Sequence, residues 1–70
     1  MNLDIAIIDL LKKHKGRVSR GKMWQDFDNY SKGYLYERLL ALKRSKLIEE
    51  VEGWYILTKR GWEIEVDKNY

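Results

Sequence analysis

The chain has 70 residues, no cysteine, no proline and one histidine, and its formal net charge is +3. This length suits a single domain spanning residues 1–70, and the lack of cysteine excludes a disulfide framework and a thiolate metal site. No apolar run reaches the roughly 18 residues of a membrane-spanning helix, and Asp4 and Asp9 interrupt the apolar N-terminal stretch, which argues against a signal peptide. We expect a cytoplasmic domain that contacts no membrane and needs no cofactor.

The charges are unevenly distributed along the chain. Residues 1–46 hold eleven Lys and Arg and five acids, a balance of +6, whereas residues 47–70 hold three and six, a balance of −3. This distribution favours the approach of a polyanion to the first part of the chain. A surface rich in Lys and Glu is also typical of heat-tolerant proteins, which is consistent with a thermophilic source.

The first helix is predicted from Leu3 to about His14, where apolar residues recur at helical spacing and Gly16 follows as a stop. Residues 17–19 are too short for an independent strand, but Val18 could pair with the edge of a later hairpin. A second helix, capped by Ser19, is predicted from Arg20 to about Asp28. Its apolar face comprises Met23, Trp24 and Phe27, which we expect to belong to the core.

The third helix carries the clearest pattern. Leu35, Leu39 and Leu42 form one apolar stripe of helical period from Ser31, a predicted N-cap, to Arg44. The residues that turn away from this stripe are Lys32, Gly33, Tyr36, Glu37, Leu40 and Arg44. After the helix, β-branched and aromatic residues within 47–57 flank the turn Glu52–Gly53, whose glycine can take a positive φ, which predicts a two-stranded hairpin. The tail is ambiguous, because Trp62, Ile64 and Val66 alternate as in a strand while Trp62 and Val66 also share a helix face.

The helix and hairpin resemble those of winged helix-turn-helix regulators, and are most similar to the PadR-like transcription regulators. The likeness covers residues 31–61, and it rests on two short motifs. The matching residues are Gly33, Tyr36, Leu39, Leu42, Leu47 and Ile48 in the first motif and Tyr55, Leu57, Thr58 and Gly61 in the second. Lys46 stands where the family usually has glycine. The resemblance implies an α+β winged helix-turn-helix with three helices, a C-terminal two-stranded β-hairpin wing and a short final helix capped by Thr58, with Asp67 to Tyr70 frayed.

The chain departs from the family pattern in three places. The second helix opens with Arg20-Gly21 rather than the usual Gly-Tyr pair, and we do not expect the long C-terminal helix that builds the family's dimer. We therefore expect a homodimer that forms through the first helix or through exposed tryptophans. The third departure is the hairpin, which is acidic where the family's wing is often basic, so that like charge would hold it away from DNA phosphates.

The resemblance implies a transcription regulator that inserts the first turns of the third helix into the major groove of double-stranded DNA. Lys32 would meet a phosphate or a guanine edge, Gly33 would allow close approach of the backbone, Tyr36 would contact a phosphate or a thymine methyl, and Glu37 would accept a hydrogen bond from cytosine N4. Ser31 and Tyr34 belong to the same predicted surface. The flanking phosphate contacts are predicted at Arg17, Arg20, Lys22 and Lys43.

Each of these assignments has a simpler structural alternative. Tyr34 or Tyr36 could cover the seam between the second and third helices, Glu37 could be a solvated helix charge, and the cations could form a solvated basic face. Trp54 and Trp62 are either covers for the small core or anchors for a partner. The alternative function is therefore a winged-helix module for protein–protein interaction.

We expect no enzymatic activity and no small-molecule ligand. The chain has one histidine, no cysteine and no glycine-rich phosphate loop, so only carboxylates remain as catalytic groups. Glu49, Glu50 and Glu52 lie on the predicted hairpin with no cleft around them. The sequence therefore predicts that they form a solubilising edge.

Overall fold

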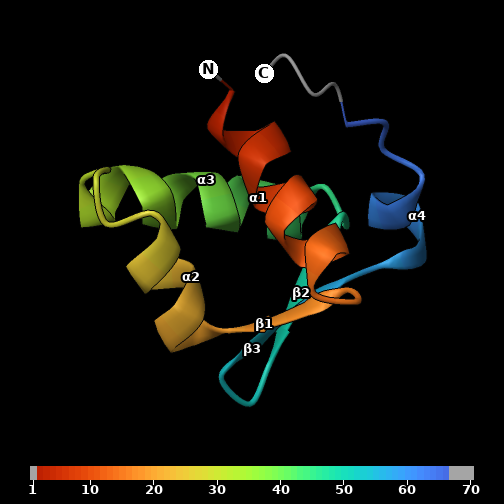
Figure 1. The fold of residues 1–70 in the computed structure, drawn as a ribbon. Helices are drawn as coiled ribbons and strands as arrows, with labels where there is room; N and C mark the ends of the chain where they lie inside the picture. The colour runs from red at the N-terminus through yellow and green to blue at the C-terminus, as the bar shows by residue number, and fades with distance from the viewer. Residues whose placement is uncertain (1, 67–70) are drawn as a thin grey trace.

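A computed structural model describes residues 2–66 of the chain. These residues form four helices and one three-stranded antiparallel sheet. The chain order is α1 (Leu3–Lys13), β1 (Arg17–Ser19), α2 (Arg20–Asp26), α3 (Lys32–Arg44), β2 (Ile48–Val51), β3 (Trp54–Leu57) and α4 (Lys59–Trp62) (Figure 1). The domain is therefore α+β, and the predicted hairpin is confirmed and joined by a third strand.

α1 is capped at both ends. The Asn2 side chain accepts hydrogen bonds from two backbone N–H groups of the first turn. At the other end, the N–H groups of Lys15 and Gly16 donate to carbonyls of the last turn, in the pairing of a Schellman motif. Gly16 helps to end the helix as predicted, but the left-handed residue directly after the cap is Lys15, with φ 62°.

α3 begins where the sequence predicts. The Ser31 hydroxyl accepts a hydrogen bond from the N–H of Tyr34 at 3.2 Å. The end of α3 repeats the Schellman pairing of α1, and Lys46 takes the left-handed conformation there with φ 64°. The leucine stripe faces inward, and each of its members is at most 4% exposed: Leu35, Leu39 and Leu42.

The sheet has the strand order β1-β3-β2. β2 and β3 are joined by the two-residue turn Glu52–Gly53, in which both residues have positive φ, as in a type I′ hairpin. β1 pairs with the free edge of β3, with Val18 opposite Tyr55, so the predicted pairing of Val18 is confirmed. The N–H of Arg20 donates to the carbonyl of Gly53 at 2.8 Å, which places the start of α2 beside the hairpin turn.

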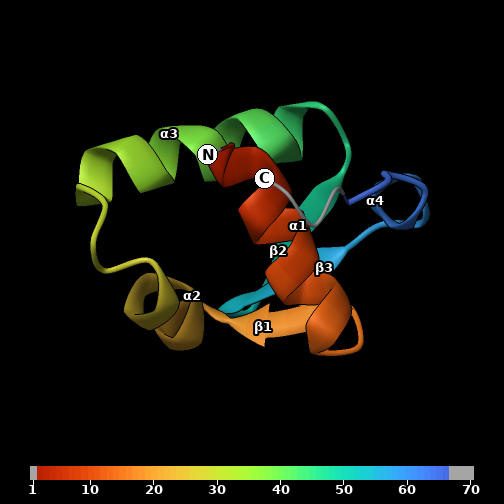
Figure 2. The ribbon, with the colours of Figure 1, turned by 45° about the horizontal axis from the view of Figure 1, so that its top comes forward.

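The core lies between α1, α3 and the sheet. α1 contacts α3 as well as β1 and β3, and Figures 1 and 2 show it crossing between α3 and the strands. Met23 of α2 is fully buried, whereas Trp24 and Phe27 are only half-buried. The expectation that both belong to the core is therefore met only in part, because both pack against the core from its margin and keep part of their surface exposed.

α4 settles the ambiguity of the tail in favour of a helix. Thr58 caps α4 by accepting from the N–H of Gly61 at 3.0 Å, and its own hydroxyl donates to the carbonyl of Lys46 at 2.6 Å. The helix ends at Trp62, which is earlier than expected, and the alternating strand interpretation is wrong for the described residues. The expected fraying of Asp67 to Tyr70 concerns residues outside the described range. Within residues 2–66, no helix has both the length and the apolar character needed to cross a membrane.

Candidate functional site

The outward face of α3 is not covered by the rest of the described chain. Because the leucine stripe packs inward, the opposite positions point to solvent, and Tyr36 is 53% exposed. Leu40 is the half-buried exception on this face. The exposed residues of the predicted recognition surface are Ser31, Lys32, Gly33, Tyr34, Tyr36 and Glu37.

Tyr34 has a second role at the start of α3. Its ring lies 6.1 Å from the ring of Tyr30, which in turn meets Phe27 edge-on at 6.2 Å. This row of aromatic rings connects the end of α2 with the first turn of α3. Tyr34 therefore contributes to the seam between the two helices, while 47% of its surface remains exposed.

A shallow groove brings together three of the predicted phosphate and base contacts. Its volume is about 280 Å³, and it lies where the start of α2 meets α3 and the hairpin. Arg20 of the second predicted helix and Tyr36 and Lys43 of the third are all predicted contacts, and all three line this groove. The remaining lining residues are Trp24, Glu50 and Tyr55.

Glu50 joins the two cations of this groove. One carboxylate oxygen pairs with the guanidinium of Arg20, and the other accepts a hydrogen bond from the Lys43 ammonium at 2.8 Å. We call these three residues the Glu50 clamp. The prediction that Glu50 is a solubilising edge charge is wrong, because its side chain turns toward α2 and α3 and is only 19% exposed.

The clamp shifts the ionisation of its members and of the neighbouring tyrosine. Hydrogen bonds from Lys43 and Arg20 lower the pKa of Glu50 below its usual value, which keeps the carboxylate charged. The same hydrogen bonds raise the pKa of Arg20 and of Lys43. Burial raises the pKa of the Tyr55 hydroxyl, which lies behind the clamp. Both cations therefore stay charged at neutral pH.

Glu50 is the functional residue that sequence reasoning missed. It is 30 residues away from Arg20 and seven from Lys43, and no local motif links them. Only the register of β2 decides that Glu50, rather than the exposed Glu49, faces the groove, because neighbouring residues of a strand point to opposite sides.

The other predicted phosphate contacts also have partners within the chain. Lys22 pairs with Asp26 at 3.2 Å on α2. The guanidinium of Arg17 lies 4.2 Å from the ring centre of Trp54, in a cation–π arrangement. Both cations remain accessible to solvent, so the alternative of a solvated basic face stays open for Lys22 and Arg17.

The two exposed tryptophans are partly engaged with the chain itself. Trp54 is 38% exposed and has Arg17 over one face, while Trp62 is 45% exposed and packs against Gly16. Each tryptophan thus packs against one neighbouring residue and keeps part of its apolar ring exposed to solvent.

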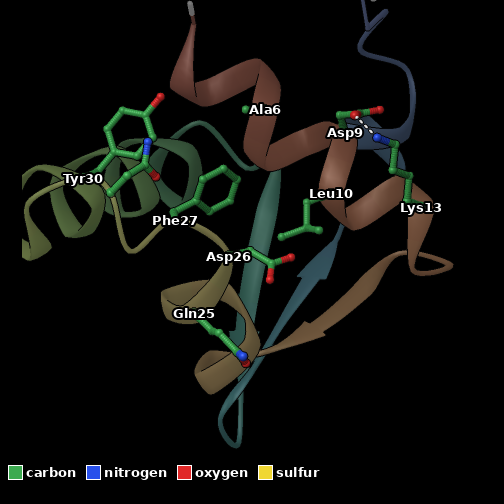
Figure 3. Close-up of a pocket in the computed structure, with 9 residues that line it drawn as sticks. Ala6, Asp9, Leu10, Lys13, Gln25, Asp26, Phe27 and Tyr30 are labelled. Carbon is green, nitrogen blue, oxygen red and sulfur yellow. Dashed lines mark ion pairs between the residues drawn. The ribbon is translucent and has the colours of Figure 1, made fainter.

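A larger hollow lies between α1, α2 and the turn before α3 (Figure 3). Its volume is about 590 Å³. Leu10 of α1 and Phe27, the residue that follows α2, point into it, and the ion pair of Asp9 with Lys13, at 2.9 Å, lies at one end. This hollow is lined by none of the predicted DNA contacts.

No group of three His, Asp or Glu side chains that could hold a metal ion occurs in the part of the chain that the structure describes. The chain matches no protein-family model, no curated protein and no solved structure.

Proposed function

We propose that the chain is a winged-helix protein that binds duplex DNA through α3 and acts as a transcription regulator. The order helix, strand, helix, helix, hairpin supports this fold, with β2 and β3 as the wing. The observation that carries the proposal is the division of α3 into a buried leucine face and an uncovered polar face. A helix of this kind is the element that the major groove of B-DNA admits.

The uncovered face supplies suitable chemistry for the groove. Lys32 and Tyr36 offer a charge and a hydroxyl to phosphates or base edges, and Glu37 offers an acceptor for cytosine N4. Gly33 adds no side chain, and nothing lies within 4 Å of the position that its Cβ would take. DNA could thus approach the backbone of the first turn closely.

Phosphate contacts around α3 support the same orientation. Arg20 and Lys43 flank Tyr36 in one groove, and Arg17 and Lys22 lie on the adjoining β1 and α2. Such contacts position a protein on DNA without reading its sequence. The acidic tip of the hairpin, Glu52–Gly53, is a poor phosphate partner, so in this proposal α2 and α3 supply most of the contacts.

The test is the salt dependence of binding to a mixed-sequence duplex, measured by fluorescence anisotropy. Each phosphate contact contributes about one unit to the slope of log affinity against log salt. Lys32→Ala should reduce the slope by about one unit, whereas Lys59→Ala, on α4 at the opposite end of the domain from α2, should leave it unchanged (Figure 2). Absence of binding at low salt, or equal losses in both variants, would contradict the proposal.

The partner proposed for the hollow of Figure 3 is a second copy of the chain. The hollow borders α1, the helix through which the sequence predicts a homodimer, so its lining would form part of a two-fold interface. Leu10 and Phe27 would supply the apolar centre. In sedimentation equilibrium, Leu10→Asp should produce monomers and the matched Tyr36→Asp should not.

The alternative function is a protein-interaction module that uses Trp54 and Trp62. The exposed surface of both rings supports this alternative. However, Arg17 covers part of the Trp54 ring, and Gly16 packs against the Trp62 ring. This alternative predicts no salt-dependent affinity for duplex DNA in the anisotropy titration.

A further inference from the structure

The Glu50 clamp has the donor arrangement of an anion site. Arg20 comes from the start of α2 and Lys43 from the last turns of α3, so two separate elements point cationic groups at one pair of oxygens. Guanidinium and ammonium groups bind the oxygens of carboxylates and phosphates alike. Arg20 and Lys43, which donate to the two carboxylate oxygens of Glu50, could therefore donate equally well to two oxygens of a phosphate.

The clamp is sheltered on one side and open on the other. The side chains of Glu50 and Lys43 are 19% and 28% exposed, whereas that of Arg20 is 56% exposed. Tyr55 is buried behind the clamp, and the half-exposed Tyr36 of the recognition face lies in the same groove. The clamp is therefore most accessible to an anion from the Arg20 side.

We propose that the clamp is a binding site for a backbone phosphate of duplex DNA, and that Glu50 occupies this site in the free protein and leaves it when DNA binds. The inference rests on the proposed function, since it assigns a regulatory role to one residue of the same interface. Glu50 is then an internal competitor for phosphate.

This exchange has a measurable consequence for affinity. Arg20 and Lys43 are paired with an anion both before and after DNA binds. Their contacts with a phosphate therefore contribute less binding free energy than the contacts of two unpaired cations would. The wild-type protein should bind DNA more weakly, and with a smaller salt slope, than its count of surface cations suggests. Removal of the Glu50 charge should reverse both effects.

The experiment compares Glu50→Gln with Glu49→Gln. Both variants remove one negative charge from β2, but Glu49 is exposed and is not part of the clamp. At low salt, Glu50→Gln should bind a duplex about tenfold more tightly than wild type and raise the salt slope by about one unit, whereas Glu49→Gln should gain less than about threefold. Equal gains in the two variants would overturn the inference.

A second measurement uses the wild-type protein and does not depend on the folding of a variant. The Glu50 carboxyl can be titrated by NMR in the free protein and in a saturated duplex complex. Its pKa should rise on binding, because Arg20 and Lys43, the cations that lower it, turn to the phosphate. Tyr36 and the buried Tyr55 are further titratable residues that line the same groove. An unchanged Glu50 pKa in a complex that does form would overturn the clamp inference alone, whereas no complex at low salt would overturn the proposed function as well.

Discussion

Arg38 donates two hydrogen bonds to the two carboxylate oxygens of Asp4, at 2.8 and 2.7 Å. The pair connects the first turn of α1 with the middle of α3 across 34 residues of sequence. When a guanidinium donates two hydrogen bonds to one carboxylate, the two groups lie in a single plane. The contact therefore fixes the distance between α3 and α1 and also restricts rotation of α3 about its own axis. Arg38 therefore helps to set the direction in which the uncovered face of α3 points.

Arg38→Lys should lower stability, because an ammonium cannot make both hydrogen bonds in one plane. The pair is partly exposed, so the loss should be modest and should shrink as salt is added. Thermal unfolding at low and high salt measures both effects. The control is Arg44→Lys, an exposed position in the last turn of the same helix, where the melting temperature should hardly change. Equal melting temperatures for the two variants would contradict this role of Arg38.

Lys46→Gly should stabilise the protein by about 1 kcal/mol. Lys46 has φ 64°, a conformation in which an L side chain is strained and glycine is not. Urea unfolding gives the change in free energy. Arg44→Gly, two residues earlier and inside α3, should instead destabilise by about 0.5–1 kcal/mol, since glycine weakens a helix. A loss of stability in Lys46→Gly would show that its side chain makes a contact that outweighs the strain.

Gly61→Ala should destabilise the protein by about 3 kcal/mol, a large share of the stability of so small a domain. The added methyl would lie 2.2 Å from the backbone oxygen of Leu47 and 2.7 Å from a side-chain carbon of Leu57, so α4 would have to move away from the hairpin. At Gly21 nothing lies within 4 Å, and Gly21→Ala should stabilise by about 0.5 kcal/mol. Chemical denaturation of both variants provides the comparison, and a neutral Gly61→Ala would refute the close packing of α4.

The pH dependence of stability should report on Glu50. Its pKa is lowered in the folded state from the usual 4.5. The Glu50 carboxylate therefore makes its full contribution to the free energy of unfolding above the pKa that it has in the unfolded chain. This contribution is lost as the pH falls through the pKa of Glu50 in the folded protein. The stability difference between wild type and Glu50→Gln should shrink in urea titrations taken from neutral pH to strong acid. A difference that stays constant down to strong acid would mean that the Glu50 charge does not hold the clamp together.

Much of the fold follows from local patterns in the sequence. The period of Leu35, Leu39 and Leu42 predicts which face of α3 is buried, and Ser31 marks its first turn because a hydroxyl can cap free N–H groups. Glu52–Gly53 predicts the hairpin, since glycine tolerates the positive φ of a tight turn. These features depend on residues only a few positions apart.

The parts that were missed depend on contacts between distant segments. The partners of Glu50 become known only once β2 is placed beside α2 and α3, and a register shifted by one residue would have brought Glu49 there instead. The left-handed conformations of Lys15 and Lys46 likewise oppose local preference, since glycine is the usual residue at that position. The surroundings of each helix end override the preference of the residue.

The binding role of α3 is tested most directly by mapping a duplex onto the protein, with amide NMR spectra recorded during titration with DNA. The account predicts that the largest shifts cluster at residues 31–37 and at Arg20 and Lys43, with little change around Leu10 in the hollow of Figure 3. Shifts confined to the surroundings of Trp54 and Trp62, or spectra that do not change at low salt, would contradict it.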